Sequence, residues 1–131
     1  INLGHVAPDI KNEICQKSYV RILSPVPREE ALRYAASCEI MLLIQNADAR
    51  SRVTIPYKTY DYLNLENSTL ALLNSQELTD LILAHGQFAV DLEDLEGIKS
   101  AIKKIMNSKR QIIQKLPKID PVKQALSLVE I

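Results

Sequence analysis

Three basic residues and one carboxylate follow the apolar run EIMLLI and are the best candidates for chemistry. Arg50 and Arg52 occur in a polar segment, and Lys58 and Asp61 follow at the expected start of a short helix. The first amides of a helix lack intrahelical partners and carry partial positive charge, so a lysine there indicates a bound anion. A carboxylate only accepts hydrogen bonds, which suits ligand hydroxyls. The pattern predicts an anion site near Tyr57 and Lys58.

Simpler interpretations of the same residues stay open. Arg50, Arg52 and Lys58 also fit solvated surface charges, and Asp61 lies near enough to Lys58 in the sequence to form an ion pair with it. The neighbouring tyrosines fit packing, with their hydroxyls reaching water.

The surrounding elements give this segment its predicted place. Residues 39–44 and 68–73 are apolar runs of strand length, typical of parallel strands covered on both faces. Two such strands joined through a helix form a βαβ crossover. In open parallel sheets, ligands bind beyond the carboxyl ends of the strands. The loop from Gln45 to Tyr57 follows the first of these strands and should therefore face any ligand. Its length also indicates a functional role, since long loops in compact domains are often functional.

The same alternation of elements extends over the chain. Strands are predicted at 1–6, 19–23, 39–44, 68–73 and 87–91, and helices at 7–17, 28–37, 58–65, 76–85, 94–106 and 122–131. The spacing of Asn74 and Glu77 indicates a helix cap at Asn74, and Gly86 suits the left-handed position after that helix. We expect an α/β fold: a Rossmann-like three-layer sandwich whose parallel sheet has about five strands. Gly4 and His5 end the first strand on the ligand side, where a lone histidine fits a helix cap as well as a ligand contact.

Composition narrows the functional classes. The chain has 131 residues, 47% hydrophobic and 24% charged, which is typical of one globular domain. Zero net charge, no Trp and one Phe argue against a nucleic-acid partner. With two histidines and no metal or nucleotide motif, we expect no metal and no cofactor. We expect Cys15 and Cys38 to be buried, reduced thiols.

The first residue, Ile1, already lies in a predicted strand, which indicates that at least one βα unit is absent before it. No signal peptide or run of about 20 apolar residues is visible. We therefore expect a cytoplasmic protein, attached to the inner face of the membrane only through a missing part.

Five segments in order resemble the carboxyl-terminal domain of GT-B-type bacterial glycosyltransferases. They are VPREEALRYAASCEIMLLI, IPYKTYDYLNL, LALLN, ELTDLI and VDLEDLEGIKSAI. The resemblance covers nearly the whole chain to about Met106. It implies a nucleotide-sugar-binding domain over 1–107, followed by a basic linker and terminal helix over 108–131.

The resemblance also implies roles for residues. The donor diphosphate would lie near the helix at Tyr57 and Lys58, Asp61 would hold the ribose hydroxyls, and Ser24, Pro25 and Val26 would meet the base. The partners would be the nucleotide sugar and an amino-terminal acceptor domain that is absent here, and the reaction would be sugar transfer to an acceptor hydroxyl. No catalytic residue is expected in this fragment, which should not turn over alone.

This chain departs from the family pattern at four places. Asp61 is one methylene shorter than the Glu that typically holds the ribose hydroxyls. Val53 replaces a frequent Glu, Thr54-Ile55-Pro56 replaces a Gly-rich approach to the sugar, and residues 66–68 replace a Gly-Pro-type turn. The sugar, the base, the acceptor, the stereochemical outcome and the oligomeric state stay open. The alternative is a non-catalytic doubly wound binding or regulatory module.

Overall fold

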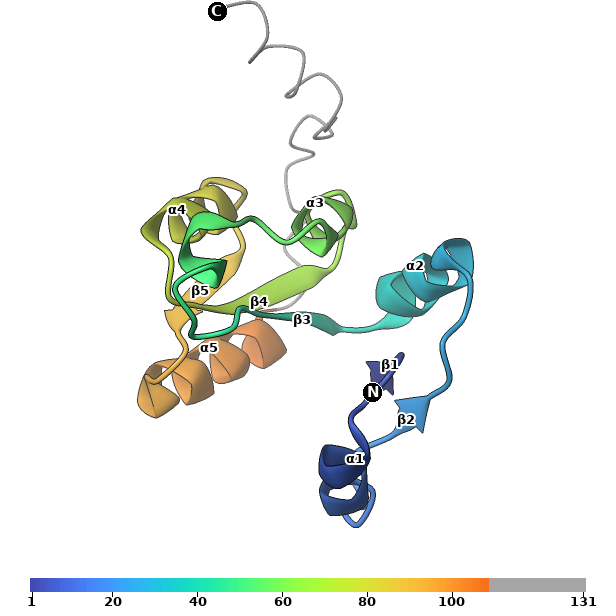
Figure 1. Ribbon diagram of the computed structural model, residues 1–131. Helices are drawn as coiled ribbons and strands as arrows, with labels where there is room; N and C mark the ends of the chain where they lie inside the picture. The colour runs from blue at the N-terminus through green and yellow to red at the C-terminus, as the bar shows by residue number, and fades with distance from the viewer. Residues whose placement is uncertain (109–131) are drawn as a thin grey trace, which may run out of the picture. The chain divides into compact units, whose positions relative to one another are not determined.

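The computed structural model describes residues 1–108, which divide into two compact units, Ile1–Ser37 and Cys38 onward (Figure 1). Apart from Ser108, the predicted linker and terminal helix over 108–131 lie outside the described residues.

The first unit pairs two short strands. Strand β1 (Asn2–Leu3) lies parallel to β2 (Ile22–Leu23), with Leu3 opposite Leu23. Helix α1 (Pro8–Ile14) connects them, and helix α2 (Arg28–Ser37) follows β2. Proline suits the start of α1 because the first helical amide has no intrahelical acceptor. No side chain in residues 1–37 is buried.

The second unit contains the buried core. Its three strands form a parallel sheet in the order β3-β4-β5. In chain order the elements are β3 (Ile40–Ile44), the 3₁₀ helix η1 (Ser51–Val53), α3 (Lys58–Leu63), β4 (Ser68–Leu73), α4 (Gln76–Ala84), β5 (Phe88–Asp91) and α5 (Leu95–Asn107).

Helices cover both faces of this sheet. Alternate strand side chains point to opposite faces, and on one face Leu43 and Leu73 pack with Leu78 of α4. On the other face Leu70 packs with Ala101 and Ile105 of α5. Figure 1 shows α3 and α4 on one side of the sheet and α5 on the other. The unit is therefore a three-layer α/β/α structure.

The structure confirms a mixed α/β fold with parallel strands and with helices close to their predicted positions. The strands form two hydrogen-bonded sheets, of two and three strands, in place of the single sheet of about five that we expected. Strands β1 and β2 have two residues each, so their pairing offers few hydrogen bonds. One continuous sheet stays a prediction.

The cap of α4 differs from the prediction by one residue. Ser75, and not Asn74, is the N-cap, and its hydroxyl accepts from the Leu78 amide. Asn74 instead donates its backbone amide to Gln45 Oε1 and its side-chain amide to the Asn46 carbonyl. The other end of α4 agrees with the sequence, since Gly86 has φ +67°.

Two smaller expectations were also tested. Cys38 is half-buried, but Cys15 is exposed, so the prediction that both thiols are buried was wrong for Cys15. Within residues 1–108, no helix combines the length and the apolar character needed to cross a membrane.

Candidate functional site

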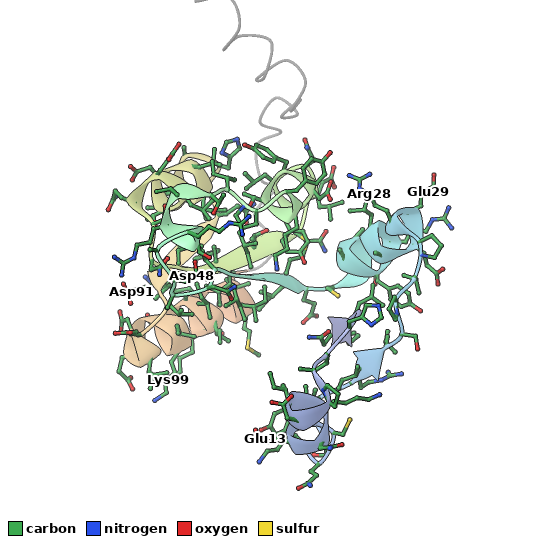
Figure 2. The ribbon with its side chains drawn as sticks, in the orientation of Figure 1. Glu13, Arg28, Glu29, Asp48, Asp91 and Lys99 are labelled. Atoms are coloured by element: carbon green, nitrogen blue, oxygen red, sulfur yellow. The ribbon has the colours of Figure 1, made fainter. Side chains whose placement is uncertain are left out.

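A polar hollow of about 600 Å³ lies at the carboxyl edge of the three-stranded sheet. The segments that follow all three strands contribute to it. We call it the carboxyl-edge hollow, and its lining residues are Ala47, Arg52, Leu73, Asn74, Ser75, Gln76, Thr79, Ala89, Val90, Asp91, Leu92 and Glu93. Figure 2 labels Asp48 and Asp91 at this edge. The hollow therefore lies where parallel sheets usually bind ligands.

Gln45 holds the loop after β3 against this edge. Its side chain is 2% exposed, and its backbone amide extends the sheet by donating to the Leu72 carbonyl at 3.0 Å. Gln45 Nε2 donates to the carbonyls of Ser51 and, at 3.4 Å, Thr54, and Gln45 Oε1 accepts from the Asn74 amide at 3.2 Å. One buried carboxamide thus ties η1 to the end of β4.

A second set of hydrogen bonds shapes the loop around η1. Asp48 Oδ1 accepts from the Ser51 amide at 2.7 Å, and the Thr54 hydroxyl donates to the Arg50 carbonyl. Hydrogen bonds from the Ser51 amide and side chain hold the pKa of the Asp48 carboxyl below its usual value, because they favour the charged form. The loop is therefore an ordered turn, although its sequence has no apolar periodicity.

The three basic residues predicted from the sequence are all exposed on this segment. Arg50 and Arg52 flank the start of η1, and Lys58 opens α3. Among the residues that the structure describes, none of the three has an ion-pair partner, so the pairing of Lys58 with Asp61 does not occur. Their positive charges are therefore available to an anion.

The start of α3 offers fewer free amides than the sequence indicated. The Thr59 amide donates to the Pro56 carbonyl, and the Tyr60 amide donates to that of Tyr57. Tyr57 is 64% exposed, and its ring meets that of Tyr60 edge-on at 6.5 Å between centroids. The anion site predicted here thus depends more on the basic side chains than on the helix start.

Asp61 and Tyr62 lie further along this helix. Asp61 is half-buried. Burial raises the pKa of the Tyr62 hydroxyl, with smaller contributions from Cys38 and Asp61. Cys38 lies just before β3, so this part of α3 is close to the amino end of that strand. Tyr57, Lys58 and Asp61 do not line the carboxyl-edge hollow, whereas Arg52 does.

The remaining predicted residues belong to the first unit. Gly4 follows β1 with φ +130°, a conformation that favours glycine, and its amide donates to the Leu23 carbonyl at 3.1 Å. His5 is exposed, as are Ser24 and Pro25, while Val26 is half-buried. Because β1 and β2 are parallel, these two groups occupy the same edge of the two-stranded sheet. The structure places them in a different unit from the basic loop.

Sequence reasoning overlooked the polar residues that build the site. Gln45 and Asn74 each follow directly after an apolar strand, and this position at a strand end was the available signal. Asn74 Oδ1 is buried and has no hydrogen-bond partner.

No group of three or more potential metal ligands occurs within residues 1–108.

Comparisons of this chain with protein-family models, with curated proteins and with solved structures found no match.

Proposed function

We propose that this chain is the donor-binding part of a glycosyltransferase, which binds a nucleotide sugar whose sugar is transferred to an acceptor hydroxyl. The observation that carries the proposal is that three basic side chains, Arg50, Arg52 and Lys58, are exposed and without an ion-pair partner among the described residues, on the segment leaving a parallel strand. The five segments that resemble GT-B-type enzymes support it independently.

In this proposal the basic residues stabilise the diphosphate as it leaves the sugar. Positive charge that is already in place lowers the energy of a transition state in which negative charge develops on the leaving group. Asp61 would accept hydrogen bonds from the ribose hydroxyls, and Ser24–Val26 would meet the base, with Gly4 and His5 on the ligand side. The proposal includes the Rossmann-like fold in which five parallel strands form one sheet.

Nucleoside diphosphates test the proposal directly. We expect ADP, GDP or UDP to raise the unfolding temperature, since a ligand at 100 times its Kd stabilises a protein by about 2.7 kcal/mol. A hydrogen bond to a charged group contributes roughly 1.5–3 kcal/mol, so Arg52→Ala and Lys58→Ala should each weaken binding roughly tenfold or more.

Lys103→Ala provides the control, because Lys103 is an exposed cation on α5 without an ion pair among the described residues. It should leave the affinity unchanged. If none of the three nucleotides binds, or if Lys103→Ala weakens binding as much as the loop variants, the proposal is wrong.

A non-catalytic binding module is the second candidate. The bonded amides of Thr59 and Tyr60 favour it, because they leave the helix start with fewer donors for a reacting diphosphate. Such a module would still bind anions through the loop. It would differ from the enzyme in showing no sugar transfer when the acceptor domain is supplied.

A further inference from the structure

We infer that Gln45 is the positioning residue of the basic loop, and that the affinity of this loop for a diphosphate depends on it. The part of the inference that concerns affinity rests on the proposed function. The part that concerns loop position rests only on the hydrogen bonds of Gln45.

The chemistry of a glutamine side chain matches its surroundings here. The two N–H donors of the carboxamide go to the carbonyls of Ser51 and Thr54, and its oxygen accepts from the Asn74 amide. Glutamate has the same length but no donor when ionised, asparagine is one methylene shorter, and leucine has neither donor nor acceptor. Only glutamine among these four can make all three bonds at this distance from the strand.

The bonded carbonyls enclose the residues that would contact the ligand. Ser51 is the first residue of η1, and Thr54 is the residue that follows this 3₁₀ helix. Fixing both of their carbonyls therefore fixes the backbone at Arg52, which lies between them. The Arg50 carbonyl is bonded to the Thr54 hydroxyl and the Val53 amide. Gln45 therefore sets the backbone from which both arginines extend.

Burial makes this arrangement specific. Gln45 is 2% exposed, and shortening its side chain removes the hydrogen-bond partner of the Ser51 and Thr54 carbonyls and of the Asn74 amide. The apparent affinity for a ligand falls when the loop adopts its binding arrangement only part of the time. A loop that is held in this arrangement avoids that loss. If the loop adopted that arrangement about a tenth of the time, its apparent affinity would fall about tenfold.

Hydrogen exchange without ligand tests the position of the loop. In Gln45→Leu we expect faster exchange at the Asn74 amide, which loses its acceptor, and at the Val53 and Thr54 amides of the released turn. Gln45→Glu keeps an acceptor but has no donor when ionised. It should restore protection at Asn74 and leave Val53 and Thr54 exchanging fast.

Gln87→Leu is the matched control. Gln87 is also a buried glutamine, 7% exposed, and its Oε1 accepts from the Thr69 amide at 2.7 Å. This variant should speed exchange at Thr69 and leave Asn74, Val53 and Thr54 as they are. If the substitutions only lowered the stability of the fold, exchange would instead become faster at all four amides, in Gln45→Leu and Gln87→Leu alike.

Binding of inorganic pyrophosphate completes the test. We expect Gln45→Leu and Gln45→Glu to bind pyrophosphate about tenfold more weakly than the wild-type chain, and Gln87→Leu to bind it equally well. Unchanged exchange at Val53 and Thr54 in Gln45→Leu, or equal losses of affinity in Gln45→Leu and Gln87→Leu, would overturn this inference alone. Failure of the wild-type chain to bind pyrophosphate would overturn the proposed diphosphate site and the role of Gln45 in affinity, while exchange would still decide its role in loop position.

Discussion

At the scale of single residues, the Asp48 carboxylate gives the loop a defined response to acid. The Ser51 amide and side chain hold its pKa below the usual value of 3.8. A lowered pKa in the folded chain means that the carboxylate stabilises the turn fully above pH 3.8. This stabilisation is lost as the pH falls through the lower folded value. We expect an NMR titration of the Asp48 carboxyl carbon to give a midpoint below 3.8.

Ser51→Ala separates the two contributions that Ser51 makes to this lowered pKa. The variant removes the side-chain hydrogen bond and keeps the backbone amide, which is the larger cause. The Asp48 midpoint should therefore rise in the variant but remain below the usual value. A wild-type midpoint at or above 3.8 would show that Asp48 does not accept the Ser51 amide in solution.

At the scale of elements, strand β3 offers a matched pair of leucines. Leu43 is fully buried against Leu73 and Leu78, whereas Leu42, on the opposite face, is 47% exposed. Deleting buried methyl groups costs their transfer energy and leaves a cavity, so Leu43→Ala should lower the free energy of unfolding by about 2–5 kcal/mol.

Leu42→Ala is its control, and about 1 kcal/mol or less is expected because half of the side chain already meets solvent. Urea denaturation of both variants measures the difference. Equal losses would show that the two faces of β3 are equally covered in solution.

The start of α5 gives a prediction that opposes a general trend. Asp94 caps this helix by accepting from the Gly97 amide at 2.9 Å. A Cβ at Gly97 would overlap with Asp94 Oδ2 and lie 2.9 Å from Val90 Cγ1. Alanine usually gains about 1 kcal/mol over glycine inside a helix, but a lost cap costs about 0.5–2 kcal/mol. With the added crowding at Val90, we expect Gly97→Ala to destabilise the chain by about 1 kcal/mol.

A double-mutant cycle checks the cause. In an Asp94→Ala background the crowded carboxylate is absent, so adding Gly97→Ala should cost less than it does in the wild-type chain. Thermal unfolding of the four proteins gives the coupling energy. Independent, additive effects would rule out the contact with Asp94 as the cause.

The helices and most strands were predictable because their signals are local. The apolar spacing of α5 and the left-handed Gly86 both appear in a short stretch of sequence. The turn at η1 was not predictable in this way, since it depends on Gln45 from the preceding strand end and on the side chain of Asp48. In the candidate site, the basic residues Arg50, Arg52 and Lys58 were predictable from their residue types and from their place after an apolar run. The structure was needed to show that Arg52 and Asn74 line the carboxyl-edge hollow whereas Lys58 does not, and that Gln45 holds the loop around Arg52.

At the scale of the whole molecule, zero net charge leaves the chain with little long-range repulsion between copies. It has 16 basic and 16 acidic residues. The described part also exposes large apolar side chains, among them Leu42, Ile44 and Met106. Proteins near zero net charge associate and precipitate more readily. Solubility should therefore be lowest near pH 7.

Two substitutions of opposite sign test whether net charge is the cause. Lys103→Glu and Glu66→Lys each change an exposed residue and shift the net charge by two units in opposite directions. If repulsion between copies limits precipitation, both should raise solubility at pH 7, measured as the polyethylene glycol concentration at the midpoint of precipitation. Lys103→Arg keeps the charge and should leave the midpoint unchanged. An increase with one sign only would point to a local contact at the substituted residue, because net repulsion depends on the magnitude of the charge and not on its sign.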